Sequence, residues 1–119
     1  MENYLKEIEI EIYEILKDFG IRMNLQGYEF ISSAIFRIIL NHRNYIKNFC
    51  MIYFDLAEEY DTTHTSVQRA IRYAIESIDF KSNKELTEEY FGKSLIQNNS
   101  ITVSQFVFGI AQKLMLKYK

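Results

Sequence analysis

The chain of 119 residues has no proline and only four glycines. These two residue types break helices most often, so few positions interrupt a helix in this sequence. The sequence also has no Pro-rich or Gly- and Ser-rich linker, no internal repeat and no low-complexity segment. We therefore expect one domain over residues 1–119, long enough to bury a core without disulfides or metals.

Cysteine and histidine are scarce as well. Cys50 is the only cysteine, so a disulfide framework is excluded and a reducing, cytoplasmic setting is expected. Its place in the apolar run Phe49-Cys50-Met51-Ile52 predicts a buried small hydrophobe rather than a nucleophile. His42 and His64 are far apart and neither has a second ligand at metal spacing, so no metal or cofactor is expected.

Long apolar runs and catalytic motifs are also missing. No stretch approaches the roughly 18 apolar residues of a membrane span, and no signal peptide opens the chain. Asp55, Glu58 and Glu59 share one helical turn, but a solvated helix face is a more common reason for such carboxylates than acid–base catalysis. Without a glycine-rich phosphate loop or a nucleophile elbow, we expect a soluble protein that is not an enzyme.

Positive charge is not in excess. The formal net charge is -2 and the pI is near 5.7, which is unusual for a protein that binds a polyanion. The charge is unevenly distributed, because residues 1–18 carry six carboxylates against two lysines, a net charge of -4, and the remainder sums to +2. Any DNA binding should be modest and very sensitive to salt, because few phosphates can be neutralised.

Apolar residues at helical spacing run along most of the chain. A strict Glu-Ile alternation over residues 7–12 could indicate a half-buried strand, but the helical spacing continues to Phe19 and favours a helix. Residues 42–51 should form a turn and a short helix, and residues 81–83 and 98–100 should form loops. The other predicted helices are 3–19, 28–41, 52–60, one that ends near Asp79, 84–90, and a last one capped by Thr102 or Ser104.

Residues 56–69 have the layout of a helix-turn-helix, which would occupy about residues 52–79. Ala57 is small where the second helix should cross the first closely, and Asp61 suits a turn because Asp tolerates a left-handed backbone. Thr62 or Thr63 can cap the second helix, although capping-box spacing over residues 65–68 leaves its start open by one or two positions. The predicted fold is all-α, with about six helices and an embedded helix-turn-helix.

The second helix of this pair, the recognition helix, has two different faces. An apolar stripe that begins at Val67 and continues to Ile75 should face the core. The residues left facing outward are His64, Thr65, Gln68, Arg69 and Arg72. Arginine can pair with guanine, glutamine with adenine, and hydroxyl groups can reach phosphates, which suits the major groove of double-stranded DNA. The same residue types also form ordinary solvated helix faces.

Several short segments, spread over nearly the whole chain, match one family in order. They are Gly20-Ile21, Gly27-Tyr28, residues 57–63, residues 67–76 (Val-Gln-Arg-Ala-Ile-Arg-Tyr-Ala-Ile-Glu), Phe91-Gly92 and residues 104–114. In these segments the chain resembles the C-terminal effector domain of stage-zero sporulation protein A, the master response regulator of endospore-forming Firmicutes. The resemblance implies an all-helical fold and DNA binding.

The resemblance assigns roles to positions of the recognition helix. Arg69 and Arg72 match two arginines with which the family contacts its DNA box. Ser66 and Gln68 stand where the family usually has an arginine and a glutamate, so one guanine contact is lost and one carboxylate becomes an amide. Each such change is worth about 1–3 kcal/mol, so the preferred DNA sequence should differ from the family's.

Hydroxyl residues near the start of the recognition helix are expected to contact phosphates. These are Thr62, Thr63 and Thr65, which precede or open the helix, where backbone N–H groups favour anions. These three threonines complete the predicted DNA-binding site, whose other members are His64, Ser66, Gln68, Arg69 and Arg72.

The resemblance also implies partners. Family members normally carry a phosphorylated receiver domain, for which we expect no room in this chain, and Asp18, Asp55, Asp61 and Asp79 all fall in helix or turn contexts unsuited to a phosphoryl acceptor. Family effector domains bind DNA as tandem pairs, which implies a homodimer on tandem sites. They contact an RNA polymerase sigma factor through a segment that corresponds to residues 82–91.

Two functions remain open on the sequence. The first is a sequence-specific DNA-binding transcription regulator. The second is a protein-interaction module that antagonises or modulates a full-length regulator, which the acidic balance and the changed positions Ser66 and Gln68 favour. Arg69 and Arg72 favour the first, because a domain that no longer binds DNA has no evident need for them.

Overall fold

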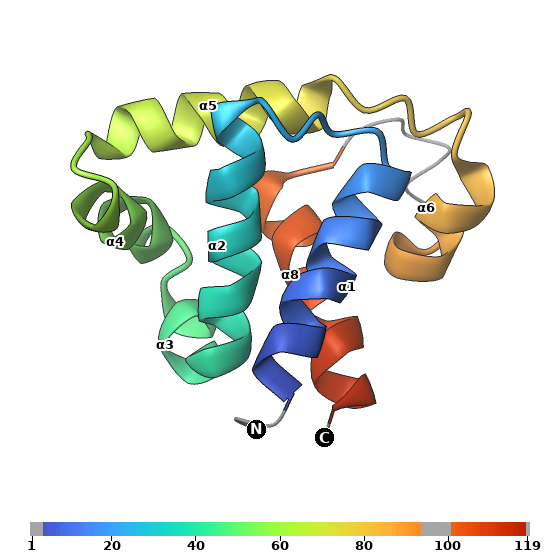
Figure 1. Ribbon diagram of the computed structural model, residues 1–119, viewed down its shortest axis with the longest axis horizontal. Coiled ribbons are helices and arrows are strands. Elements are labelled where there is room, and N and C mark those ends of the chain that lie inside the picture. The colour runs from blue at the N-terminus through green and yellow to red at the C-terminus, as the bar shows by residue number, and fades with distance from the viewer. Residues whose placement is uncertain (1–3, 94–100, 119) are drawn as a thin grey trace.

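The computed structural model describes residues 4–93 and 101–118. Within these ranges every regular element is an α-helix, which confirms the all-α prediction. The helices, shown in Figure 1, are α1 (Leu5–Asp18), α2 (Gln26–Leu40), α3 (His42–Lys47), α4 (Met51–Glu59), α5 (His64–Glu76), α6 (Lys84–Phe91) and α8 (Val103–Lys117). The loop expected at residues 98–100 lies outside the described residues.

The helix boundaries lie within two residues of the predictions, with one larger shift. The alternating segment of residues 7–12 is helical and belongs to α1. The recognition helix is α5, and it ends at Glu76 instead of near Asp79. It ends early because Ser77 turns its hydroxyl back to donate to the carbonyl of Ala74 at 2.6 Å, after which Ile78 and Phe80 are buried outside the helix.

α2 is the central helix of the fold. It packs against α1, α5 and α8, and Figure 1 shows it between the other helices. Its apolar face is fully removed from solvent, in the residues Phe30, Ile31, Ala34, Ile35 and Ile38. Burying each of the four larger side chains contributes about 1.5–3 kcal/mol to folding, so α2 supplies much of the free energy that holds the other helices in place.

An aromatic cluster joins the end of α1 to the second half of the chain. Its centre is Phe19, which is 1% exposed. Ring centroids of four other aromatic residues lie 5.5–6.1 Å from that of Phe19, namely Phe80, Tyr90, Phe91 and Phe106. Aromatic pairs at these spacings add to the free energy of burial, so the cluster ties α6 and α8 to α1.

The end of α8 is fastened to α1 by polar contacts. Lys117 pairs with the carboxylate of Glu11 at 2.6 Å, and the Tyr118 hydroxyl donates a hydrogen bond to the same carboxylate. This hydrogen bond raises the pKa of the Tyr118 phenol to about 12, because ionisation would place two negative charges together.

The prediction that Cys50 is buried is wrong. Cys50 is exposed, because it precedes the first turn of α4 and its apolar neighbours divide between the surface and the core. Met51 is 44% exposed, whereas Ile52 is fully buried. The apolar run crosses a helix start, so its residues do not share one face.

The start of α2 approaches α5 very closely at Gly27. A Cβ atom built on Gly27 would lie 2.3 Å from the backbone oxygen of Ala70 and 2.8 Å from the Cβ of Ala74. Both distances are too short for non-bonded atoms, so only glycine allows the two helices to meet at this point. Gly27 thereby fixes how α5 lies on the core.

We expect Gly27→Ala to lower the free energy of unfolding by about 1–3 kcal/mol, because overpacking would force α5 away from α2. The higher helix propensity of alanine, about 1 kcal/mol, offsets only part of this loss. Chemical denaturation of the wild type and the variant measures the difference. Gln26→Ala, at the exposed neighbouring position, is the control and should change stability by less than about 0.5 kcal/mol. A gain in stability for Gly27→Ala would contradict the close packing.

Candidate nucleic-acid interface

The turn between α4 and α5 is built around Asp61. Its φ of 53° is left-handed, as its place in the sequence predicts. The N–H of Thr62 donates to the carbonyl of Ala57 at 2.9 Å, and the N–H of Asp61 donates to that of Glu58 at 3.4 Å. This pair of bonds is a Schellman motif. It ends α4 and directs the chain into α5.

Thr63 is the cap of α5. Its Oγ1 accepts from the backbone N–H of Ser66 at 3.1 Å and donates to the Ser66 hydroxyl at 2.8 Å. α5 therefore begins at His64, and the alternative start given by the capping-box spacing of residues 65–68 is wrong. The hydroxyl groups of Thr63 and Ser66 bind each other, so both are held in fixed positions at the start of the helix.

The inner face of α5 is packed on α2 and α4. Its buried residues are Val67, Ile71, Ala74 and Ile75, four of the five in the predicted stripe, and Ala70 is half-buried beside them. Ala57 of α4 is 7% exposed, which agrees with the small residue expected where the two helices cross. Because this face is buried, the rotation of α5 about its own axis is set, and its opposite face is presented to solvent.

All eight predicted site residues lie in the turn or on α5. Six of them are exposed and two, Thr62 and Gln68, are half-buried. The exposed ones are Thr63, His64, Thr65, Ser66, Arg69 and Arg72. In the described ranges neither Arg69 nor Arg72 takes part in an ion pair; the two ion pairs found there involve Arg37 and Lys117. Both guanidinium groups can therefore donate to an external acceptor.

A hollow of about 320 Å³ runs along one side of α5. Gln68 and Arg72 line it from α5, and Phe49 and Tyr53 line it from the region of α4. Burial raises the pKa of the Tyr53 phenol, and the positive charge of Arg72 opposes this shift. The amide of Gln68 thus lies beside the hollow and not at the centre of the exposed face.

His64 is stacked on an aromatic residue that the sequence interpretation missed. The ring centroids of His64 and Phe54 are 4.2 Å apart and the planes are inclined by 27°. Phe54 is 49% exposed although it belongs to an apolar stretch of α4. The stack limits the rotation of the imidazole at the first residue of α5. Nothing in the local sequence distinguishes Phe54 from its buried neighbours.

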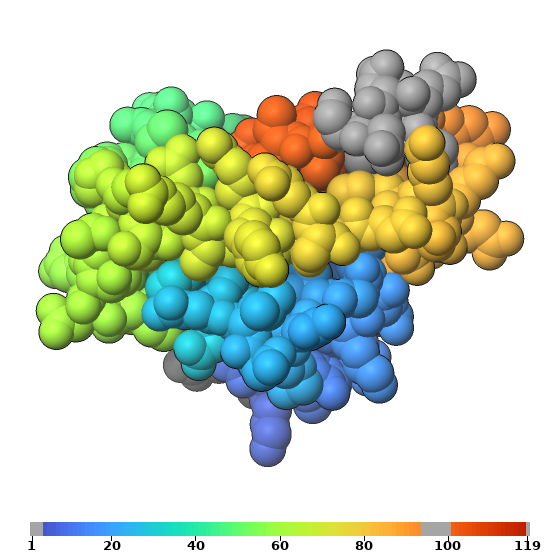
Figure 2. Space-filling model, turned by 90° about the horizontal axis from the view of Figure 1, so that it is seen from above, coloured from blue at the N-terminus to red at the C-terminus, as the bar shows by residue number. Residues whose placement is uncertain are grey.

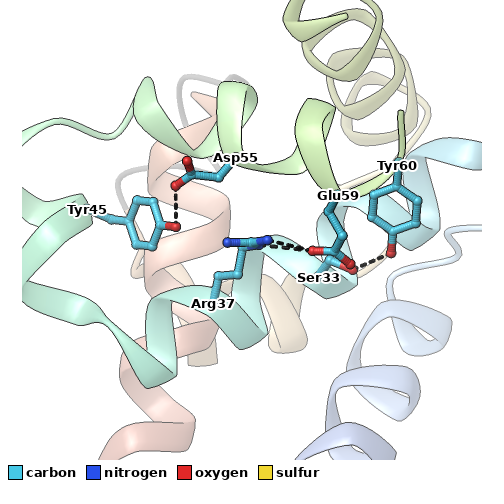
Figure 3. A network of polar contacts seen from close by, with 6 residues as sticks. All are labelled: Ser33, Arg37, Tyr45, Asp55, Glu59 and Tyr60. Atoms are coloured by element: carbon cyan, nitrogen blue, oxygen red, sulfur yellow. Dashed lines mark hydrogen bonds and ion pairs between the residues drawn. The ribbon is translucent and has the colours of Figure 1, made fainter. Parts of the chain in front are cut away.

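A polar network fixes α4 to α2 and α3 behind this interface (Figure 3). Arg37 pairs with Glu59 at 2.8 Å, and the Tyr45 hydroxyl donates to Asp55 at 2.6 Å. Ser33 and Tyr60 share a hydrogen bond of 2.6 Å. Burial raises the pKa of Tyr45, and so does its bond to the Asp55 carboxylate. The exposed ion pair contributes little energy by itself, so its main effect is to orient α4.

No three His, Cys, Asp or Glu side chains of residues 4–93 and 101–118 come together as metal ligands would. Over the same ranges no helix combines the length and the apolar composition needed to cross a membrane.

The described residues form an all-helical arrangement whose helix-turn-helix presents two arginines to solvent, which is the form of a DNA-binding domain of the helix-turn-helix class. Comparison with known families agrees with this class. The family described as "Sporulation initiation factor Spo0A C terminal" matches residues 12–114, and the chain belongs to this family. It is a family of DNA-binding effector domains, so at the family level the protein is a DNA-binding regulator.

We expect Thr63→Ala to lower the free energy of unfolding by about 1 kcal/mol, because the Ser66 N–H loses its acceptor at the start of α5. Thr63→Ser keeps the hydroxyl and should retain most of the stability. Thr65→Ala, an exposed threonine two residues later, is the control. Denaturation curves of the three variants measure the effect. Equal losses for Thr63→Ala and Thr65→Ala would show that the cap contributes nothing.

Proposed function

We propose that this protein is a sequence-specific transcription regulator that inserts α5 into the major groove of double-stranded DNA. The observation that carries the proposal is the outward presentation of Arg69 and Arg72 on a helix whose other face is buried. Each guanidinium group can make two parallel hydrogen bonds to the O6 and N7 atoms of a guanine. The Gly27 contact and the Thr63 cap hold α5 in place before DNA binds, which lowers the entropy lost on binding.

The remaining site residues have different roles in this proposal. His64 and Thr65, in the first turn of α5, contact phosphates together with Thr62 of the preceding turn. The Thr63 hydroxyl donates to Ser66, so it stabilises the helix start and can meet DNA only as an acceptor from a base amino group. The Ser66 hydroxyl keeps its own hydrogen and can donate it to a phosphate or to a base acceptor. Gln68 contacts a base at the edge of the groove, where an amide favours adenine.

The preferred DNA sequence in this proposal differs from that of the family. A serine hydroxyl at position 66 cannot make the two parallel bonds that an arginine makes to guanine. The base contacts then depend mainly on Arg69 and Arg72, with a secondary contribution from Gln68. Because the formal net charge is -2, few phosphate contacts are available and the affinity is modest. Its dependence on salt is then shallower than the sequence led us to expect, since each phosphate contact contributes only about 0.9 to the slope of log affinity against log salt.

Two protein contacts belong to the proposal through the family resemblance. One is pairing with a second copy on tandem DNA sites. The other is an RNA polymerase sigma factor, which would dock on residues 82–91. These residues include α6, which lies beyond the C-terminal end of α5 (Figure 1). A partner on α6 would therefore sit beside the DNA without covering Arg69.

The second candidate is a protein-interaction module that binds a full-length regulator and antagonises it. The acidic surface of α1 favours it, since Glu7, Glu9 and Glu14 are all exposed. Under this alternative α5 does not need to enter DNA, and removing Arg69 has no effect on DNA affinity.

A selection from random duplex DNA, followed by anisotropy titrations at several salt concentrations, distinguishes the two. We expect a recovered motif, and we expect Arg69→Ala to weaken its binding about tenfold to 100-fold, the equivalent of a lost bidentate base contact of about 1–3 kcal/mol. Arg43→Ala removes the same charge from an exposed position on α3 and should change the affinity less than about twofold.

Either of two results would contradict the DNA proposal. One is a selection that enriches no motif. The other is an equal effect of Arg69→Ala and Arg43→Ala, which would mean that only the overall charge matters. A selection that enriches no motif would favour the protein-interaction module, and pull-down with a full-length family regulator would then be the next measurement.

A further inference from the structure

A second segment shares the exposed surface of α5. Figure 2 shows the chain between α1 and α2 directly beside α5 on one face of the molecule. The Gly27 contact explains this placement, because it brings the first turn of α2 against Ala70 and Ala74. The connection that precedes α2, residues 19–25, is therefore carried to the flank of the recognition helix.

The backbone of this connection is fixed. Ile21 N–H donates to the carbonyl of Leu16 at 3.0 Å, and Gly20 N–H donates to that of Lys17 at 2.9 Å. With Gly20 at a φ of 86° these bonds form a Schellman motif. Ile21 is 3% exposed and anchors the connection in the core. Arg22, the next residue, is exposed to solvent.

The exposed side chains of this region suit a nucleic-acid backbone. Between Gly20 and Tyr28 the sequence has one cation, Arg22, and no carboxylate. The nearest carboxylates on either side of this segment in the sequence are Asp18, at the end of α1, and Glu29, in α2. Met23 is 58% exposed, and Tyr73, one turn from Ala70 on α5, is 67% exposed. We call Arg22, Met23, Asn24 and Tyr73 the flanking strip.

The widths of α5 and of the major groove determine which part of the DNA the flanking strip can contact. An α-helix with its side chains is about 10–12 Å across and the major groove is about 12 Å wide, so α5 fills the groove. A segment packed against the side of α5 cannot enter beside it. It lies instead over the edge of the groove, where the sugars and phosphates are.

Given the function proposed above, on which this step rests, we propose that the flanking strip is a second DNA contact in which Arg22 binds a backbone phosphate. Met23 and Tyr73 lie against the adjoining sugars, and Asn24 can donate to the next phosphate along the strand. Contacts of this kind position the protein on the duplex without selecting a base. They give α5 its register in the groove, and the helix-turn-helix of residues 52–79 alone does not contain them.

Charge reversal at two arginines tests the proposal. Arg22→Glu and Arg43→Glu each take the formal net charge from -2 to -4, so any general electrostatic effect is the same for both. Arg43 is exposed on α3, which lies away from α5 toward the other end of the molecule (Figure 1). Binding of the selected duplex and of a scrambled duplex is measured by anisotropy at several salt concentrations, with Arg69→Ala in parallel and thermal melts of every variant.

We expect Arg22→Glu to weaken both duplexes by the same factor, about tenfold beyond the effect of Arg43→Glu. The slope of log affinity against log salt should fall by about 0.9, the value for one phosphate contact. The recovered motif should not change. Arg69→Ala should instead weaken the selected duplex much more than the scrambled one.

Three results would overturn the inference. Equal effects of Arg22→Glu and Arg43→Glu, with selective loss in Arg69→Ala, would remove the flanking strip and leave the proposed function intact. A changed motif in Arg22→Glu would mean that Arg22 contacts a base and not a phosphate. Absence of DNA binding by the wild type would remove both the flanking strip and the proposed function.

Discussion

The position of the recognition helix depends on the contact of Gly27 with Ala70 and Ala74. α2 is held on its other sides by α1 and α8, so this contact connects α5 to the whole core and not only to its partner α4. Any side chain at position 27 would clash with Ala70 and Ala74 and push the two helices apart. The orientation of the exposed face of α5, and with it the direction of Arg69 and Arg72, therefore follows from the absence of one methyl group.

The sequence predicted the elements of this fold better than the contacts between them. The helical spacing from Leu5 to Phe19 outweighed the local alternation of α1, and Asp61 marked the turn because few other residues adopt a left-handed backbone. Local rules could not place Cys50 or Phe54, since both lie in an apolar stretch that crosses a helix start. Gly27 was recognisable as part of a matching segment, but its contact with Ala70 is a tertiary property that no local pattern contains.

The candidate site, like the fold, was predicted where local sequence decides the outcome and not where tertiary contacts decide it. Periodicity identified the exposed residues of α5 because its inner face is strongly apolar, and Arg69 and Arg72 are exposed as expected. It could not show that Ser66 is bound to Thr63, or that Gln68 borders a hollow. It also could not include residues 22–24, which are at least 40 positions from α5 in sequence. Residues brought together by the tertiary fold are invisible to a window of neighbouring positions.

The attachment of α8 to α2 and to Glu11 of α1 also affects how the chain folds during its synthesis on the ribosome. The helix-turn-helix is synthesised before α8, so α4 and α5 emerge while one side of α2 still lacks its cover and Glu11 still lacks Lys117. Contacts between segments so distant in sequence form late, because closing the intervening loop costs entropy. The nascent chain can therefore make the turn at Asp61 and the contact of Gly27 with Ala70 early, whereas α8 covers the remaining side of α2 last.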